Sequence, residues 1–138
     1  AAQGIQEDTE NGWITYGNIR IVPYVYNIPA ALAVADVVVG RGGALSSAEI
    51  TARGIPAVLV PYPYSAEGHQ LANARVLESH GAARVILDAQ MNGETLYRNV
   101  MEILSDPVLW QQMRNASRRL GRPQATQELA QLMRATVR

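Results

Sequence analysis

Short apolar runs alternate with helical apolar patterns through the middle of this chain. A run without polar alternation predicts a strand buried on both faces, and DVVVG (36–40), which ends in glycine, is the clearest case. The predicted strands are 19–25, 36–40, 57–61 and 83–88. The helices predicted between them are 27–35, 46–53 and 68–79. The order of elements is therefore strand, helix, strand, repeated.

The ends of these helices have typical capping residues. Asn27 is placed to cap the first helix, with Pro29 in its first turn. Gly54 ends the second helix, and Gly81 follows the third at the position where a left-handed residue is common.

The two ends of the chain differ from its middle. Residues 1–18 are polar and contain glycine, so we expect a loop-like start. Residues 89–138 predict a helical tail: 93–104, a helix capped by Asp106 that runs to Gly121, and 123–136. Trp110 is the expected core anchor of this tail. No repeat or linker divides the chain, so we expect a single domain over 1–138, with a βαβ core at 19–88.

Strand–helix alternation at these spacings favours the α/β class, with a Rossmann-like, doubly wound parallel sheet. Such sheets bind ligands at the carboxyl ends of their strands. Three loops, 25–28, 40–46 and 61–69, are expected at that edge.

Composition excludes several classes of function. The apolar fraction of 48% is enough for a core, and 12 basic residues balance 12 acidic ones, so no overall charge attracts nucleic acid. Cysteine is absent, which excludes disulfides and thiolate chemistry, and no apolar run is long enough for a membrane span. No serine elbow, acid–base carboxylate pair or metal-ligand spacing stands out. We therefore expect no catalytic residue, metal site or cofactor in this chain.

The loop Gly40-Arg41-Gly42-Gly43-Ala44 joins a predicted strand to a predicted helix. Its glycines would let a ligand approach the backbone, and the helix N-terminus favours an anion such as a phosphate. Glycine in such a turn can equally serve only to reach a positive φ. The pattern leaves both interpretations open.

Ser46 and Glu49 also allow two interpretations. Their spacing fits a capping box, in which Ser46 caps the helix and Glu49 bonds back to the Ser46 amide. Alternatively, Glu49 is a carboxylate near a strand's carboxyl end that accepts hydrogen bonds from a ribose. The pattern alone favours the cap.

The segment 67–73 opens the next helix at the same edge. His69, Gln70 and Asn73 lie on one face at helical spacing, where their donors and acceptors could recognise sugar hydroxyls. An ordinary polar surface explains the same pattern.

Read together, these motifs resemble the donor-binding half of a GT-B glycosyltransferase, and more narrowly the MurG family. The motifs are ADVVV, the R-x-G-A-L-S of 41–46, Glu49, the Gly-Ile-Pro before a strand, and the H-Q-x-x-N-A of 69–74. That family transfers N-acetylglucosamine from UDP-GlcNAc to lipid I in peptidoglycan synthesis. The match covers residues 19 to about 88 closely.

The resemblance implies a UDP-GlcNAc site. The backbone of Val25 would pair with uracil, and Gly43, Ala44, Leu45 and Ser46 would lie beside the nucleotide and diphosphate. Glu49 would hold the ribose hydroxyls. Gln70, with His69 and Asn73, would bind the sugar. Arg41 would either order the loop or approach the phosphates.

The resemblance also implies that much of the enzyme lies elsewhere. The family's acceptor domain, its catalytic residues and the first two donor-domain strands have no counterpart in 1–138. We expect the chain alone to be inactive, and either to self-associate or to pair with the missing N-terminal part. The intact enzyme would be cytoplasmic, peripheral on the inner face of the plasma membrane. The alternatives are another GT-B UDP-sugar transferase and a non-catalytic nucleotide-sugar-binding module.

Overall fold

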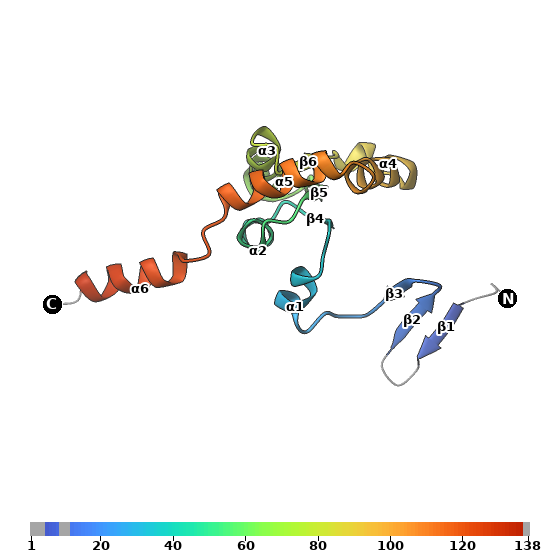
Figure 1. The fold of residues 1–138 in the computed structure, drawn as a ribbon, viewed down its shortest axis with the longest axis horizontal. Coiled ribbons are helices and arrows are strands. Elements are labelled where there is room, and N and C mark those ends of the chain that lie inside the picture. The colour runs from blue at the N-terminus through green and yellow to red at the C-terminus, as the bar shows by residue number, and fades with distance from the viewer. Residues whose placement is uncertain (1–4, 9–11, 137–138) are drawn as a thin grey trace. The chain divides into compact units, whose positions relative to one another are not determined.

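A computed structural model describes residues 5–8 and 12–136 of the chain, and Figure 1 shows its helices and strands. The chain divides into two compact units, Ala1–Ala31 and Leu32–Arg138. The expectation of a single domain over 1–138 therefore stays a prediction. Within the described residues, no helix is long and apolar enough to cross a membrane.

The first unit contains a three-stranded antiparallel sheet in the order β1-β2-β3. Its strands are β1 (Ile5–Asp8), β2 (Trp13–Tyr16) and β3 (Ile19–Ile21). Gly17, with φ of 57°, lies in the two-residue turn that joins β2 to β3. The guanidinium of Arg20 lies 5.0 Å from the centre of the Trp13 ring.

This sheet corrects two expectations. The loop-like start over 1–18 is wrong for 5–8 and 13–16, because WITY is rich in β-formers and Gly17-Asn18 is a hairpin turn. The strand expected at 19–25 ends at Ile21 and pairs antiparallel with β2, so it is not part of a parallel βαβ core. Pro23, which has no amide hydrogen to donate, follows soon after.

Helix α1 (Ile28–Ala33) begins where the capping pattern predicted. The Asn27 side-chain oxygen accepts a hydrogen bond from the Ala30 amide at 3.0 Å, which satisfies one of the free donors of the first turn.

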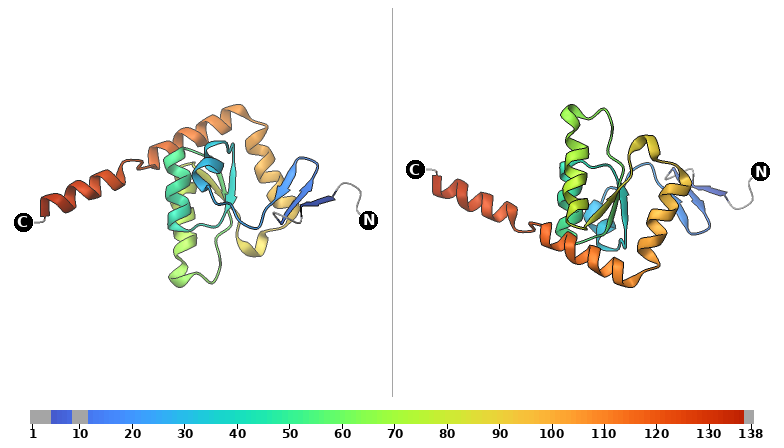
Figure 2. Two further views of the ribbon diagram at one scale, coloured as in Figure 1. Left: turned by 90° about the horizontal axis from the view of Figure 1, so that it is seen from below. Right: turned by 90° about the horizontal axis from the view of Figure 1, so that it is seen from above.

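The second unit contains a parallel sheet in the order β4-β5-β6. The chain runs through β4 (Val38–Gly40), α2 (Ala44–Arg53), β5 (Ala57–Leu59), α3 (His69–Ser79) and β6 (Ala83–Val85). Figure 2 shows α2 and α3 on one side of this sheet and α4 (Gly93–Leu104) on the other. Helices α5 (Pro107–Leu120) and α6 (Ala125–Thr136) complete the tail. The predicted α/β class with a helical tail is confirmed.

Strand β5 is the strand that is buried on both faces. Ala57 and Leu59 face a cluster formed with α2 and α3, whereas Val58 and Val60 face a second cluster with Ile103 and Met113. The same burial was expected of 36–40, and this is wrong, since Val39 is 46% exposed. The reason is position: β5 is central, and β4 is at an edge of the sheet.

Helix α5 is capped at its first turn and is held against the sheet through Trp110. The Asp106 carboxylate caps the helix by accepting from the amides of Val108 and Leu109, as predicted. The Trp110 ring packs against the second cluster, and its Nε1 donates to the Asp36 carbonyl at 2.8 Å. Trp110 thus anchors α5 to the start of β4.

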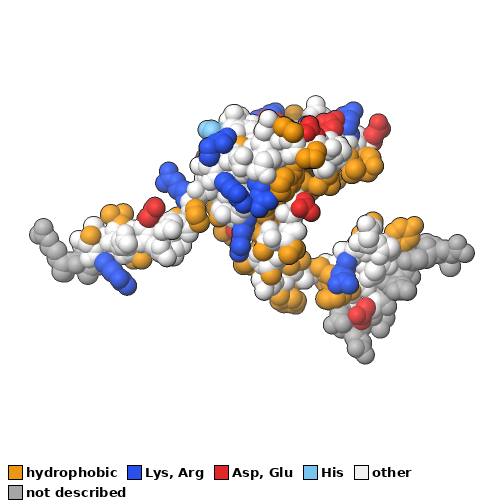
Figure 3. Space-filling model, in the orientation of Figure 1, with side chains coloured by type: hydrophobic (Ala, Val, Ile, Leu, Met, Phe, Trp, Pro, Cys, Tyr) orange, Lys and Arg blue, Asp and Glu red, His pale blue; other side chains and the backbone are white. Residues whose placement is uncertain are grey.

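Helix α6 keeps its apolar side chains exposed. Leu129, Leu132 and Met133 share one face of the helix and are each about 60% exposed. Hydrophobic side chains are visible along this helix in Figure 3.

Candidate functional site

The carboxyl ends of β4, β5 and β6 lie at one edge of the parallel sheet, because the three strands run in the same direction. The segments that follow them, 41–43, 60–68 and 86–88, form what we call the rim. Helix α2 and helix α3 both begin there. Nine of the ten predicted site residues lie in these segments or in the first two turns of those helices.

Gly42 is the point where the rim packs most tightly. A Cβ added at this position would lie 2.3 Å from the Gln70 carbonyl oxygen and 3.2 Å from the Ala74 Cβ. The Asn73 side-chain amide donates to the Gly42 carbonyl at 3.2 Å. Glycine at 42 is therefore needed for the close approach of α3, whatever ligand the loop binds.

Helix α2 begins two residues earlier than predicted. Gly43 is its N-cap, with φ of −67°, and no side chain caps it. Ser46 lies inside the first turn, so the predicted capping box is wrong. The first intrahelical bond runs from the Ser47 amide to the Gly43 carbonyl. The amides of Ala44, Leu45 and Ser46 precede it and are left without an intrahelical acceptor.

Glu49 is consequently not used as a cap. It is half-buried one turn further along α2. It makes no hydrogen bond or ion pair with any part of the chain that the structure describes. The carboxylate is thus free to accept hydrogen bonds from a ligand.

Arg41 spans the rim from the end of β4. Its Nη1 donates to the Val60 carbonyl at 3.1 Å and to Asp88 Oδ1 at 2.6 Å. Its guanidinium carbon lies 5.7 Å from the centre of the Tyr62 ring. One side chain therefore connects the ends of all three parallel strands.

The first turn of α3 is also tied to the rim. Gln70 Oε1 accepts from the Tyr62 amide at 2.9 Å, and Asn73 bonds Gly42 as described above. His69 is exposed, with its Nε2 3.3 Å from a Glu67 carboxylate oxygen. Glu67, at φ of 50°, is the one non-glycine residue with positive φ among those described. Gln70 thus holds one surrounding loop through its side-chain oxygen, and Asn73 holds another through its side-chain nitrogen.

Val25, the tenth predicted residue, belongs to the unit Ala1–Ala31 and is exposed there. Its predicted place in the site stays a prediction.

Two cavities open at the rim. One, of about 270 Å³, lies between the loop after β5 and the segment 87–89. The other, of about 190 Å³, is lined by Arg41, Asp88 and residues near the ends of β4 and β5. Asp88 borders both cavities. The Arg41–Asp88 pair therefore lies beside the spaces that a ligand could enter.

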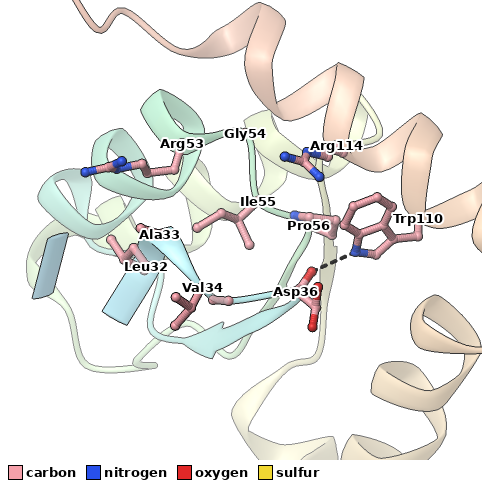
Figure 4. A pocket seen from close by; sticks show the side chains of 11 residues that line it. Leu32, Ala33, Val34, Asp36, Arg53, Gly54, Ile55, Pro56, Trp110 and Arg114 are labelled. Atoms are coloured by element: carbon pink, nitrogen blue, oxygen red, sulfur yellow. Dashed lines mark hydrogen bonds between the residues drawn. The ribbon is translucent and has the colours of Figure 1, made fainter. Parts of the chain in front are cut away.

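A further cavity, of about 270 Å³, lies at the opposite edge of the sheet. Figure 4 shows Arg53, Arg114, Trp110 and Asp36 around it. Asp36 and Pro56 precede their strands, so this cavity is at the amino ends of β4 and β5 and away from the predicted site. Across 5–8 and 12–136, no group of three His, Asp or Glu side chains is placed to hold a metal ion.

The sequence pattern did not single out Asp88. It follows β6 at the carboxyl end, so the rule that locates binding loops could have identified it. Its partner could not be found in this way, because Arg41 and Asp88 are 47 residues apart in the chain.

Comparison with known proteins bears on these residues. The model of the glycosyltransferase family 28 C-terminal domain matches residues 2–131. A UDP-N-acetylglucosamine–N-acetylmuramyl-(pentapeptide) pyrophosphoryl-undecaprenol N-acetylglucosamine transferase of Moorella thermoacetica is 49% identical over 122 residues, which are 88% of this chain and 33% of the relative. A protein of the same name from Desulforamulus reducens is 44% identical over 127 residues, 91% of this chain and 34% of that protein.

A solved structure gives the same result. The crystal structure of Acinetobacter baumannii MurG superimposes with a TM-score of 0.73 at 31% identity, covering 83% of this chain and 33% of that one. The chain thus spans about a third of the length of the relatives it matches. The family match over nearly the whole chain, together with the fold, shows that this chain belongs to the glycosyltransferase family 28 C-terminal domain family.

Proposed function

We propose that this chain is the UDP-GlcNAc-binding portion of an inverting N-acetylglucosaminyltransferase that acts on lipid I in peptidoglycan synthesis. The observation that carries the proposal is the start of α2, where three amides without intrahelical acceptors and the unpaired Glu49 lie at the rim. The names of the relatives support the donor and the acceptor.

In this proposal the predicted residues have the following roles in donor binding. The free amides of Ala44, Leu45 and Ser46, with the positive end of the α2 dipole, bind the diphosphate, and Gly43 lets it approach the backbone. Glu49 accepts hydrogen bonds from the two ribose hydroxyls. Gln70 Nε2 and Asn73 Oδ1, which are not the atoms that bond Tyr62 and Gly42, bind the sugar together with His69. Val25 pairs with the uracil edge.

The chain's chemical contribution is to orient the donor and stabilise the leaving group. In the intact enzyme, a hydroxyl of the lipid acceptor attacks the anomeric carbon, the configuration inverts, and UDP leaves. The amides at the α2 N-terminus offset the charge that develops on UDP. The acceptor domain supplies the catalytic residues, and lipid I and the membrane's inner face are partners of the intact, cytoplasmic enzyme.

Titration with UDP-GlcNAc tests this proposal. Glu49→Ala removes a carboxylate that accepts ribose hydroxyls, and hydrogen bonds to charged groups are worth about 1.5–3 kcal/mol. We expect UDP-GlcNAc affinity to fall at least about tenfold with no loss of stability. Glu128→Ala, on α6, is the control and leaves affinity unchanged.

Three results would contradict it. Equal affinity for UDP-GlcNAc and UDP-glucose would favour a transferase with another donor. Unchanged affinity in Glu49→Ala, with lowered stability, would show that Glu49 is a structural residue. A gene product that binds UDP-GlcNAc without transferring the sugar would favour a non-catalytic module.

A further inference from the structure

The contacts of Arg41 bear on how the rim is organised. Its guanidinium reaches from the end of β4 to the Val60 carbonyl after β5 and to the Asp88 carboxylate after β6. The Tyr62 ring lies beside it. Asp88 is the first residue of a short helical turn, Asp88–Gln90, which begins at the end of the segment 86–88. The carboxylate is thus held by backbone that does not belong to the loop carrying Arg41.

The residues after Arg41 connect this contact to the start of α2. Gly42 is held against α3 by Asn73, and Gly43 is the N-cap of α2. The position of Arg41 therefore affects where the free amides of α2 point. A shift of about 1 Å in groups that orient a substrate can reduce rates by about a hundredfold.

The energetics indicate that this ion pair does not serve mainly for folding. The side chains of Arg41 and Asp88 are 52% and 40% exposed. Ion pairs with such exposure contribute about 0–1 kcal/mol to stability, because water screens them. The main effect of the Arg41–Asp88 pair is therefore on the position of the Arg41 side chain.

We propose that Asp88 is a positioning residue for donor binding, which holds Arg41 across the rim so that Arg41 orders the loop 41–43 and does not contact the diphosphate. This inference rests on the proposed function of the same site. Without the Asp88 charge, the guanidinium would be drawn to an incoming diphosphate and the loop would move with it. With the charge, Arg41 stays paired and the α2 amides remain available.

Exchanging the charges of Arg41 and Asp88 tests whether Arg41 orders the loop 41–43 or contacts the diphosphate. The variants are Asp88→Asn, Arg41→Asp, and the double variant Arg41→Asp/Asp88→Arg, all made in the gene product that contains residues 1–138. Glu102→Gln is the control, since it weakens another ion pair between elements, Arg84–Glu102, which joins β6 and α4. The measurements are the KM for UDP-GlcNAc, the KM for the lipid acceptor, kcat and the melting temperature.

We expect Asp88→Asn and Arg41→Asp to raise the donor KM about tenfold or more. The acceptor KM and the melting temperature stay near those of the wild type. The double variant recovers most of the donor affinity, because the pair is restored with its charges exchanged. Glu102→Gln leaves the donor KM unchanged.

Two outcomes would overturn the inference. If the double variant is as impaired as Arg41→Asp, Arg41 contacts the diphosphate directly. If Asp88→Asn leaves the donor KM unchanged, Asp88 has no positioning role. A wild-type protein that does not bind UDP-GlcNAc would instead refute the proposed function.

A measurement without ligand distinguishes failure of the Asp88 inference from failure of the proposed function. The NMR order parameters of the Gly42 and Gly43 amides report fast motion of the loop. We expect them to fall in Asp88→Asn and to recover in the double variant. Unchanged order parameters in Asp88→Asn would refute the positioning role of Asp88, whatever donor the protein uses.

Discussion

At the scale of single residues, the identity of a side chain often indicated chemistry without indicating its partner. Ser46 and Glu49 have the spacing of a capping box, yet α2 begins at Ala44 and Gly43 is its cap. Gly42, which drew attention only as one glycine among three, is the residue that α3 approaches most closely. These roles depend on how α2 and α3 pack, and the residues next to each position in the sequence do not specify that packing.

Gly42→Ala should destabilise the protein. The added methyl group would lie 2.3 Å from the backbone oxygen of Gln70, which can move only if α3 shifts. Overpacking of this kind costs about 1–3 kcal/mol in the free energy of unfolding. Gly40→Ala is the control, because no atom lies within 4 Å of its new Cβ. Urea unfolding measures both, and equal stabilities would show that the loop is free to move away from α3.

At the scale of elements, helices were better predicted than strands. The expected helix 93–104 coincides with α4, and the caps Asn27 and Asp106 bond as predicted. Helix ends are signalled by nearby residues, since a cap bonds an amide two or three positions away. No comparable local signal shows where a strand ends or which strand is central. The run at 36–40 looked like a central strand, whereas the central strand is β5.

One ion pair between elements gives a pH dependence. A hydrogen bond from Arg84 and its positive charge lower the pKa of Glu102 below the ordinary value of 4.5. A lowered pKa in the folded state stabilises the fold above the ordinary pKa, and this contribution is lost as the pH falls through the lowered value. In urea unfolding, wild type should therefore exceed Glu102→Gln in stability at neutral pH and lose that advantage below about pH 4. A difference that is the same at pH 7 and pH 3 would contradict the assigned cause.

At the scale of the whole molecule, the two edges of the parallel sheet differ. At the β6 edge, Glu78 Oε1 accepts from the outward-facing Val85 amide at 3.0 Å. At the β4 edge, Val38 and Gly40 bond toward β5, so the Val39 backbone faces outward. In the parts of the chain that the structure describes, no strand or side chain pairs with that backbone. An unpaired edge can add another strand.

We therefore expect residues 1–138 in isolation to self-associate in a concentration-dependent way, as measured by sedimentation. Val39→Pro removes the outward amide hydrogen without breaking a bond to β5, so it should shift the protein to monomer. Val39→Thr keeps that hydrogen and the β-branched shape, and it should associate like wild type. A wild-type chain that stays a folded monomer at all concentrations would refute this expectation.

The sequence by itself determined the class of the fold, most helix ends and the edge of the sheet where the proposed site residues gather. These follow from local apolar periodicity, from caps a few residues away, and from the rule that parallel strands share their carboxyl edge. Only the tertiary structure decided that 19–21 pairs antiparallel, that β4 is an edge strand, and that Arg41 meets Asp88. These depend on which segments meet across long stretches of chain, and residue types alone do not specify such pairings.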